Sequence, residues 1–296
     1  MSALLVTDLH THSTASDGTD RPAELVAKAA AAGIDVLAIT DHDTTGGWAE
    51  ALEHRPPALT VITGAEFSCV YVDDERRISL HLLGYLFDPD DANLQAERAR
   101  LRDDRRGRAH LMVDNMVADG LPISWEQVSA LAAGGAVGRP HLARALVTAG
   151  VVPDIDSAFR DVLSSRGGYY VRKSDTDVFA AIAMLRAAGG LPVFAHPLAR
   201  RRGPVVSDAV VARMAAAGLV GLEVEHPDQD PADRAQAAGL ARDLGLIGTG
   251  SSDYHGTNKT TGLAACTTAP AALEALLALP AALRPVGPLD PDGRPR

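Results

Sequence analysis

The 296-residue chain is predicted to have an α/β fold built on a parallel β-sheet, either open or closed into a barrel. One reason is the alternation of short apolar segments with longer segments that have helical periodicity. Another is that the short apolar segments end in His, Asp or Glu. Functional groups at the carboxyl ends of parallel strands are typical of a barrel active site. The length suits one large domain or a domain with an insert.

The expected strands follow one another along the chain with helices between them. The segment "RPAELVAKAAAAGI" is predicted to be helical, with Pro22 near its start and Gly33 at its end. Further helices are expected at 179–190, at 207–219 and after Pro270. The segments predicted to be strands are 3–10, 35–43, 58–68, 78–87, 191–197, 220–228 and 246–255.

A different pattern interrupts this alternation near residues 96–168. The stretch contains helical patterns and an arginine-rich segment, "ERARLRDDRRGRAH", and no strand signal appears until "GGYYVRK". We therefore expect a barrel domain formed by residues 1–95 and 169–285, with a mostly helical insert at 96–168. The proline-rich end, 286–296, is expected to be a flexible tail.

The composition limits the partners and the compartment. A formal net charge of −10 argues against binding to long duplex DNA or to anionic membranes, but it leaves room for a small basic pocket. The two cysteines, Cys69 and Cys266, lack the spacing of a disulfide framework, which favours a reducing cytosol. The first residues become polar too early for a signal peptide, and no segment has the length of a membrane span. We expect a cytoplasmic monomer.

Metal-binding side chains collect at the ends of the predicted strands. Seven of the ten histidines lie there, which a random distribution would not produce. Imidazole nitrogens and carboxylate oxygens bind divalent ions such as Zn, Mn and Fe, and this set is larger than one tetrahedral ion requires. A cluster of two or three ions explains it best. The strand-end residues are His10, His12, Asp17, Asp41, His42, Glu66, His81, His196, His226, Asp253 and His255.

The stretch "DLHTHSTASDGT" at residues 8–19 illustrates how such a cluster forms. His10 and His12 are two residues apart, so in a strand they point to the same face and can bind one ion together. Asp17, in the loop beyond, can bind a neighbouring ion. A cluster of this kind lowers the pKa of bound water and holds phosphate oxygens during in-line displacement. An HxH pair alone is more often structural, and the prediction depends on the recurrence of ligands at successive strand ends.

Six motifs taken together resemble the PHP superfamily, which is named for polymerase and histidinol phosphatase. They are "DLHTHSTASDGT", "AITDHD", "TGAEFS", "LHLLGY", "AHP" and "GSSDYH", and the match covers most of the chain. The resemblance implies a distorted (β/α)7 barrel, the PHP fold, with two or three metal ions, and Glu66 would bridge two of them. The implied ligands are, for the first ion, His10, His12, Glu66 and Asp253, for the second, Glu66, His81 and His196, and for the third, Asp17, His42 and His255.

The segment "GRPHLARALV", after a helical insert, is similar to one branch of that superfamily. The branch includes nucleoside 3',5'-bisphosphate phosphatases and 5'-to-3' exonucleases that act on short oligonucleotides. The resemblance implies that Arg139, His141 and Arg200 contact substrate phosphates, for which the planar donor fork of arginine is suited. Lys173 is a further candidate for phosphate binding. The competing interpretation of each cationic residue is a solvated surface charge.

Three residues are candidates for catalytic roles. Asp17 belongs to the expected metal cluster, and Asp41 is expected to orient His42 as the carboxylate partner of a metal-bound imidazole. His226 is expected to contact substrate, to protonate a leaving group or to cap a loop. Related proteins often have a second histidine shortly after this position, where this chain has Gln and Asp at 229–230. This difference leaves the substrate open.

The arginine-rich segment is expected to be a solvated helix, because its acidic residues can pair with its arginines at i,i+4 spacing. A short single strand passing between insert and barrel is the alternative interpretation. Tyr169 and Tyr170 would then be the nearest aromatic pair able to flank a base.

The predicted function is a metal-dependent phosphoesterase in which metal-activated hydroxide attacks a phosphomonoester of a small nucleotide. A nucleoside 3',5'-bisphosphate suits a metal centre beside an arginine pocket. Manganese is the expected metal, with iron or zinc as alternatives. The alternative functions are a 5'-to-3' exonuclease on short oligonucleotides, a histidinol-phosphate phosphatase, and a non-catalytic nucleotide or metal sensor.

Overall fold

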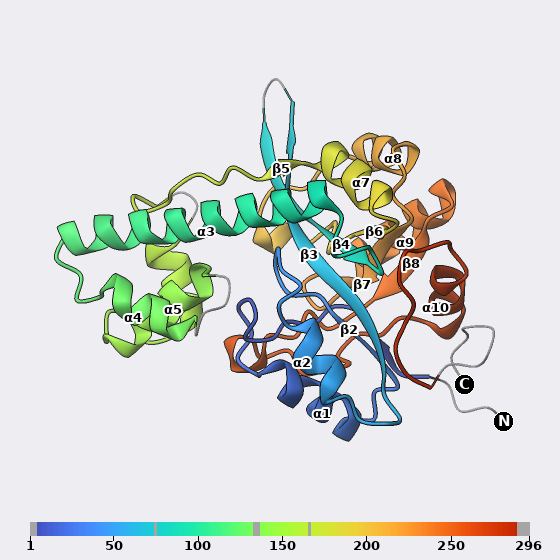
Figure 1. Ribbon diagram of the computed structural model, residues 1–296. Helices are drawn as coiled ribbons and strands as arrows, with labels where there is room; N and C mark the ends of the chain where they lie inside the picture. Colours follow the sequence, from blue (N-terminus) through green and yellow to red (C-terminus); the bar gives the residue numbers. More distant parts are fainter. Residues whose placement is uncertain (1–4, 74–75, 133–136, 165–166, 289–296) are drawn as a thin grey trace.

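The computed structural model describes residues 5–73, 76–132, 137–164 and 167–288. Over these residues the chain forms a nearly closed barrel of seven strands with helices outside it (Figure 1). Neighbouring strands follow the order β1-β2-β3-β4-β6-β7-β8. The strands are β1 (Thr7–Asp8), β2 (Val36–Ile39), β3 (Thr60–Val72), β4 (Arg77–Tyr85), β6 (Leu191–Phe194), β7 (Gly221–Glu225) and β8 (Ile247–Gly250).

The barrel closes through the segments that follow its first and last strands. Thr11 and Tyr254 form a parallel bridge, and the His12 amide donates a 2.9 Å hydrogen bond to the Tyr254 carbonyl. The distorted barrel expected from the sequence is therefore confirmed. Closure at this point brings the segments after β1 and β8 together at the end of the barrel where the strand-end histidines lie.

β4 runs against the direction expected for a parallel sheet. It pairs antiparallel with both β3 and β6, whereas the other neighbours along the barrel path are parallel. The cause is the four-residue separation between Val72 and Arg77. A connection this short allows only a hairpin, since a parallel neighbour needs a crossover of about a dozen residues or more.

The segment "GGYYVRK" is not a strand, contrary to expectation. Two of its carbonyl groups accept hydrogen bonds from arginine side chains instead of from a neighbouring strand. Arg108 Nε donates to Val171 O at 3.0 Å, and Arg77 Nη2 donates to Lys173 O at 2.8 Å. The chain joins the sheet only afterwards, as the short strand β5 (Thr176–Asp177) beside β3.

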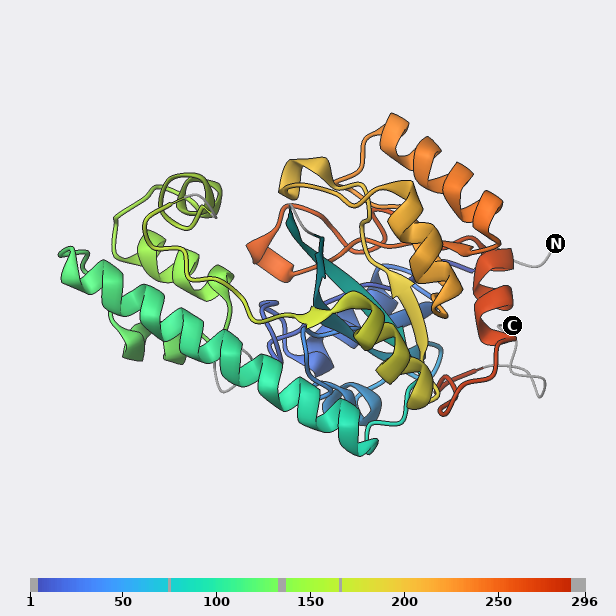
Figure 2. The same cartoon turned by 90° about the horizontal axis from the view of Figure 1, so that it is seen from above.

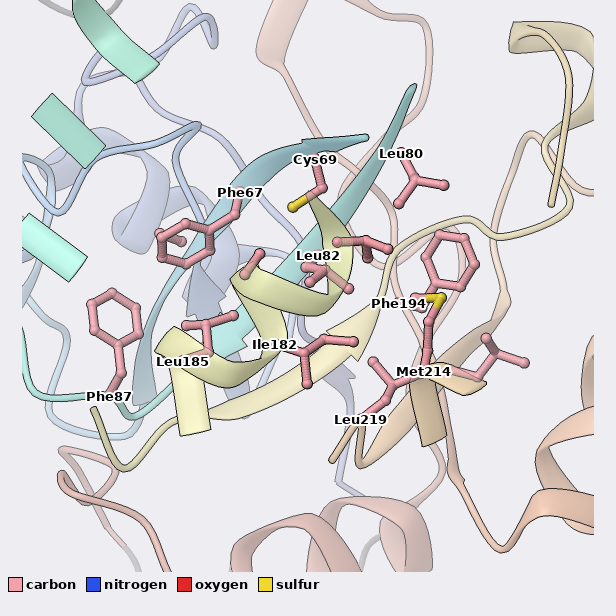
Figure 3. Packing of buried hydrophobic residues seen from close by; sticks show 14 of the residues in the cluster. Phe67, Cys69, Leu80, Leu82, Phe87, Ile182, Leu185, Phe194, Met214 and Leu219 are labelled. Atoms are coloured by element: carbon pink, nitrogen blue, oxygen red, sulfur yellow. The ribbon is translucent and has the colours of Figure 1, made fainter. Parts of the chain in front are cut away.

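Helices pack on the outside of the barrel, four of them at predicted positions, while α2 (Trp48–Glu53) and α9 (Pro231–Leu244) were not predicted. In the core of Figure 3, Leu185 of α7 belongs to the same hydrophobic cluster as Phe67 of β3 and Leu82 of β4. Gly84 makes this close packing possible, because a Cβ there would lie 2.5 Å from Leu185 Cδ2. Within the described ranges, none of the helices has the length and hydrophobicity needed to cross a membrane. The barrel helices include α1 (Pro22–Ala31), α2 (Trp48–Glu53), α7 (Val178–Ala187), α8 (Asp208–Ala216), α9 (Pro231–Leu244) and α10 (Pro270–Leu277).

The stretch predicted as an insert is helical and has a hydrophobic cluster of its own. α3 (Ala92–Ala118) begins on the barrel and extends to α4 (Trp125–Leu131) and α5 (Arg139–Thr148) (Figures 1 and 2). Its Leu94 belongs to the barrel cluster, whereas its Met112 belongs to a second cluster that also includes Leu146. α3 passes residue 96 without a break, so the boundaries 96–168 stay a proposal. The other helices of this stretch are α4 (Trp125–Leu131), α5 (Arg139–Thr148), α6 (Ile155–Ser157) and the π-helix η1 (Ala158–Val162).

The chain is still attached to the barrel beyond residue 285, the predicted end of the barrel domain. Val286 forms an antiparallel bridge with Val61, with reciprocal backbone hydrogen bonds of 2.7 and 2.9 Å. The first residue of the stretch expected to be flexible, 286–296, is therefore attached to the barrel. Residues 289–296 lie outside the described residues.

Candidate active site

The nine residues proposed as metal ligands come together around Glu66. Seven of them follow the carboxyl ends of parallel strands, whereas Glu66 and His81 lie within β3 and β4. Glu66 Oε2 is 3.1 Å from the Nε2 atoms of both His10 and His12. Glu66 Oε1 is 2.6 Å from His81 Nδ1 and 3.2 Å from His196 Nε2. One carboxylate thus faces imidazoles from both halves of the barrel, the arrangement expected of a bridging ligand.

Two further carboxylates extend this cluster. Asp253 Oδ1 lies 3.4 Å from each Nε2 atom of the HxH pair. Asp17 Oδ1 lies 3.4 Å from His255 Nε2, and its Oδ2 lies 3.7 Å from His42 Nε2. The ligand atoms fall into overlapping groups, each compact enough to hold an ion.

Three imidazole nitrogens of the cluster are buried and have no hydrogen-bond partner among the described residues. They are His10 Nε2, His12 Nε2 and His42 Nδ1, and each lies 3.1 or 3.2 Å from Glu66 Oε2. Buried nitrogens left without a partner are unfavourable. Nitrogen and carboxylate donors directed at common points are the ligands of borderline divalent ions, so these residues fit a cluster of more than one ion.

Burial and charge set the protonation of the cluster. Burial raises the pKa of Glu66, but neighbouring imidazoles, above all that of His81, outweigh it and hold this pKa well below its usual value. Burial, assisted by the charge of Arg202, lowers the pKa of His196 to about 3. Burial likewise lowers the pKa of His255 to about 4. The carboxylate is therefore ionised and these two imidazoles are neutral, which is the state that metal ligands require.

His10 and His12 differ from the other histidines. Burial lowers the pKa of each ring, but adjacent carboxylates outweigh it, raising the pKa of His12 to about 9 and that of His10 well above its usual value. These two rings hold protons when no cation is present. Binding of a divalent ion must displace those protons.

Backbone strain occurs in the same region. Asp43, His196 and Asp253 have φ angles of 53°, 33° and 52°, in the left-handed region that residues other than glycine rarely adopt. Such conformations cost roughly 1–3 kcal/mol each and persist only where the surroundings hold them. Two of the three are proposed metal ligands, so their positions depend on the hydrogen bonds around them.

Asp41 has partners other than the expected His42. Its Oδ1 accepts hydrogen bonds from the Ser13 amide and the Ser16 hydroxyl, each at 2.7 Å, and its Oδ2 accepts one from the Ser13 hydroxyl at 2.8 Å. These contacts fix the loop that carries Asp17. Asp41 therefore shapes the loop that presents one proposed ligand, in place of orienting His42.

The arginine-rich face of α3 is docked on the barrel. Arg98 Nη1 donates to Thr45 Oγ1 at 2.8 Å. Arg102 Nη1 donates to the Asp43 carbonyl at 3.0 Å, and Arg105 Nη2 donates to the Asp43 carboxylate at 2.7 Å. The three arginines are spaced i, i+4 and i+7, so they share one helix face. The expectation of a solvated helix is wrong for this face, because its arginines bond to loops of the barrel.

The insert reaches the edge of the metal cluster through its "GRPH" segment. A Cβ built on Gly138 would lie 3.6 Å from Arg105 Nη1 and 3.8 Å from Asp17 Oδ2. The Gly138 amide donates to His141 Nδ1 at 3.0 Å, so the neutral ring of His141 carries its proton on Nε2. Burial lowers the pKa of His141, which keeps the ring neutral.

Cationic side chains gather where the segment 170–175 passes β4. Burial lowers the pKa of Lys173 to about 8, and the nearby charges of Arg105 and Arg139 add to this effect against the opposing carboxylate of Asp175. A cavity of about 190 Å³ opens beside Lys173, and Tyr170 is in its lining. The tyrosine that precedes it, at position 169, instead packs against the hydrophobic cluster of the insert.

The structure does not bring Arg200 to the metal cluster. Its side chain is half exposed, and its Nε donates to Asp233 Oδ1 at 2.8 Å. Arg202, two residues later, reaches inward instead, and its Nη2 donates to Asp253 Oδ2 at 2.6 Å. Lys259 Nζ donates to the same oxygen at 2.6 Å. The outer oxygen of a proposed metal ligand is therefore held by two cations.

His226 is buried at the same place with a defined tautomer. Its Nδ1 accepts a 3.0 Å hydrogen bond from the Asp228 amide, so the neutral ring keeps its proton on Nε2. That nitrogen lies 3.3 Å from Asp253 Oδ2. Gln229 has a structural role, since its Oε1 accepts from the Leu198 amide at 2.8 Å and its Nε2 donates to backbone carbonyls.

The sequence prediction missed several residues beside the cluster, among them Glu223, Arg202 and Lys259. Glu223 has a fully buried side chain, and its Oε1 lies 3.2 Å from His10 Nδ1. A carboxylate inside the apolar segment "VGLEVEH" is the signal that could have identified it, because such a residue must either be exposed or have buried partners. Arg202 lies in a single 3-10 turn, η2 (Arg200–Arg202), and Lys259 follows another, η3 (Gly256–Asn258), so spacing gives no comparable signal.

A nearly closed α/β barrel with buried His, Asp and Glu side chains at its strand ends defines a metal-dependent hydrolase. The PHP domain matches residues 8–118. Curated relatives more than 30% identical align with most of the chain. The chain belongs to the PHP family, and it is a metal-dependent phosphoesterase.

Three similar proteins illustrate the range of this family. The 5'-3' exoribonuclease of Haemophilus influenzae is 34% identical over 249 residues, which cover 84% of this chain and 89% of the relative. The 3',5'-nucleoside bisphosphate phosphatase of Chromobacterium violaceum is 32% identical over 255 residues, covering 84% and 86%. The crystal structure of a metal-dependent phosphoesterase from Bifidobacterium adolescentis has a TM-score of 0.85 and 35% identity, covering 91% of this chain and 94% of that chain.

Proposed function

We propose that this phosphoesterase removes one phosphate from a small nucleotide that carries two, most simply a nucleoside 3',5'-bisphosphate. The observation that supports this proposal is the group of cationic side chains near the metal cluster, in which Arg105 lies with Asp17 beside Gly138 and the charges of Arg105 and Arg139 act on Lys173. A metal cluster with a separate group of cationic side chains suits a substrate with one phosphate at each place. The Chromobacterium violaceum relative, a bisphosphate phosphatase, supports the same substrate.

The proposed ions number two or three, and manganese is the proposed metal, with iron or zinc as alternatives that suit the same donors. When bound, the ions supply an activated water and neutralise charge on the phosphate that is cleaved. The residues proposed to hold them are His10, His12, Asp17, His42, Glu66, His81, His196, Asp253 and His255.

The other side chains of the site are proposed to bind and orient the substrate. Arg139 and Lys173 hold the phosphate that is not cleaved, and His141 faces it with its Nε2 proton. Arg202 replaces Arg200 as the arginine beside the cleaved phosphate, because its guanidinium already lies at Asp253. His226 keeps its Nε2 proton directed at the cluster, where it can donate to a substrate oxygen.

A second candidate function is a 5'-to-3' exonuclease on short oligonucleotides. The cavity beside Lys173 favours it, because Arg77, Tyr170 and Arg172 also line that cavity and would suit the backbone and base of a second nucleotide. The Haemophilus influenzae relative is a 5'-3' exoribonuclease, which supports the same reading. Both functions use the same chemistry and differ only in what lies beyond the cleaved bond.

The test is phosphate or nucleotide release from a panel of substrates with added Mn²⁺, repeated after chelation. The panel contains adenosine 3',5'-bisphosphate, AMP, histidinol phosphate and a 5'-phosphorylated tetranucleotide, and Asp17→Asn is the inactive control. Turnover of the bisphosphate that stops on chelation supports the phosphatase. Efficient cleavage of the tetranucleotide supports the exonuclease, and absence of turnover on every phosphoester contradicts both.

We also propose that the protein works as a monomer in the cytosol. Cys69 and Cys266 are free thiols, which supports a reducing compartment. Size-exclusion chromatography with light scattering tests the monomer, which predicts a mass near 30.9 kDa.

A further inference from the structure

We infer that Glu223 is a positioning residue that fixes two proposed metal ligands, His10 and His196, without binding an ion itself. The inference rests on the metal centre in the proposed function and names a residue that orients it. Glu223 lies in β7, while the two histidines follow β1 and β6, so one carboxylate links three strand ends.

The first contact fixes the ring of His10. Glu223 Oε1 lies 3.2 Å from His10 Nδ1, so this nitrogen donates its proton to the carboxylate. The lone pair of the neutral ring is then on Nε2, which faces Glu66 Oε2 at 3.1 Å and Asp253 Oδ1 at 3.4 Å. A carboxylate behind a metal-binding imidazole sets its tautomer and orientation and makes it a better ligand.

The second contact holds the backbone of His196. Its amide donates a 2.7 Å hydrogen bond to Glu223 Oε2, and its φ angle of 33° lies in the strained left-handed region. A strained residue keeps its conformation only when its surroundings hold it. We assign this role to the carboxylate, which places the His196 imidazole 3.2 Å from Glu66.

His10, Glu223 and His226 lie close enough together to hold an ion, but both oxygens of Glu223 already accept hydrogen bonds. Oε1 also accepts a hydrogen bond from the Ser251 hydroxyl, and the side chain is fully buried. His226 is the remaining nearby donor, with its Nε2 atom 3.9 Å from Glu223 Oε2. Because His226 Nδ1 accepts from the Asp228 amide, its Nε2 keeps a proton and does not offer a lone pair.

The test compares Glu223→Gln with Glu225→Gln. The control residue lies in the same strand, but its carboxylate is half exposed and pairs with Arg234. In Glu223→Gln, an amide NH₂ replaces an oxygen that accepts from either His10 or His196, so one of the two contacts is lost. Isothermal titration with Mn²⁺ should give an affinity about 10- to 100-fold weaker for this variant, with the same number of ions at saturation. Glu225→Gln should bind like the wild type.

Ion affinity unchanged in Glu223→Gln overturns the inference. One fewer ion at saturation also overturns it, because Glu223 would then be a ligand. If the variant does not fold, as judged by circular dichroism, Ser251→Ala replaces it, and about threefold to tenfold weaker binding with unchanged stoichiometry is expected. Unchanged affinity in that variant overturns the inference. A wild-type protein that binds no divalent ion contradicts the proposed function itself, and the inference with it.

Nuclear magnetic resonance of the Zn²⁺-loaded protein gives a readout independent of activity. The ¹⁵N shifts of the His10 ring should report a protonated Nδ1 and a metal-bound Nε2 in the wild type. A protonated Nε2 in the wild type would contradict the positioning role. The positioning role is supported if Glu225→Gln keeps the wild-type ¹⁵N pattern of the His10 ring and Glu223→Gln loses or broadens it.

Discussion

Arg200 and Arg202 are two residues apart in one short 3-10 helix, η2 (Arg200–Arg202), yet their guanidinium groups have different environments. Arg200 pairs with the buried Asp233 outside the metal cluster, and its own guanidinium is half exposed, so solvent weakens the ion pair. Arg202 donates to the oxygen of Asp253 that points away from the HxH pair. At the scale of single residues, the function depends on which of these two arginines reaches the proposed metal ligand Asp253. The sequence alone does not distinguish them.

This contrast predicts different effects of the same substitution. Arg202→Gln should lower kcat/KM about 10- to 100-fold, the usual effect of removing a partner of a metal ligand. Arg200→Gln should stay within about twofold of the wild type because the contact that it removes, with Asp233, lies outside the metal cluster. Steady-state kinetics on the preferred substrate measures both. Equal losses in the two variants would place Arg200 at the substrate after all.

The lowered pKa of Lys173 predicts a pH dependence of substrate binding. Its pKa of about 8 means that the ammonium group loses its charge above that pH, and its attraction for phosphate is lost with it. The KM for a bisphosphate should therefore rise above pH 8, by about 10-fold or more once the charge is gone. Lys173→Arg should keep KM low to higher pH, and Lys173→Met should give a high KM that does not change across this range.

The same pKa has a consequence for stability. The folded pKa of Lys173 lies below its ordinary value of 10.5, so the unfolded chain binds this proton more tightly. The group therefore destabilises the fold below pH 8, and this effect disappears as the pH rises from 8 to 10.5. Lys173→Met should be the more stable protein at pH 7 in urea unfolding, and a less stable variant would contradict the assignment.

At the scale of elements, the start of α5 is the point where the insert meets the metal cluster. Gly138 has room for a Cβ, since the nearest atom to it would be 3.4 Å away, but further carbons would enter the space toward Arg105 and Asp17. Gly138→Ala should keep near-normal activity. Gly138→Val should raise KM at least about tenfold with little change in melting temperature.

Kinetics and differential scanning fluorimetry on this pair test the placement of the insert. A valine variant with normal KM would mean that the substrate does not approach α5. A valine variant that melts much earlier than the alanine variant would mean that the position is structural, since a packing conflict destabilises the fold by about 1–3 kcal/mol.

Most strand-end ligands could be predicted because short apolar segments fix both the strand and the side chain that follows it. The direction of β4 is a different matter, since it depends on the length of a connection more than on the apolar pattern. "GGYYVRK" has strand-forming residues, but arginine side chains occupy two of its carbonyl groups. Such contacts come from distant parts of the chain, as do those of Glu223, and no local pattern reports them.

At the scale of the whole molecule, ion binding and folding are coupled. The cluster contains several buried carboxylates and two imidazoles with raised pKa values, and ions bind to it only in the folded chain. Mn²⁺ at 100 times its dissociation constant should stabilise the fold by about 2.7 kcal/mol, or about 4 °C in melting temperature for a chain of this size. Chelation should reverse the shift.

The size of that shift should depend on pH. Protons compete with the ion for His12 below pH 9, so the Mn²⁺-dependent shift should be smaller at pH 6 than at pH 8. Differential scanning fluorimetry at both pH values checks this, with Mg²⁺ as a comparison ion that favours oxygen ligands. A shift of the same size at both values would mean that the histidines are not ligands.

The bridge between Thr11 and Tyr254 has a consequence for synthesis of the chain. The segments that close the barrel are the same segments that carry the HxH pair and Asp253, and more than 240 residues separate them. While the chain is still on the ribosome, His10 and His12 emerge before the segment of Tyr254 and have no partner strand on that side. The metal centre can therefore be completed only after Asp253 has been translated, and an arrested chain that lacks Asp253 would leave these imidazoles open to whichever metal the cell offers.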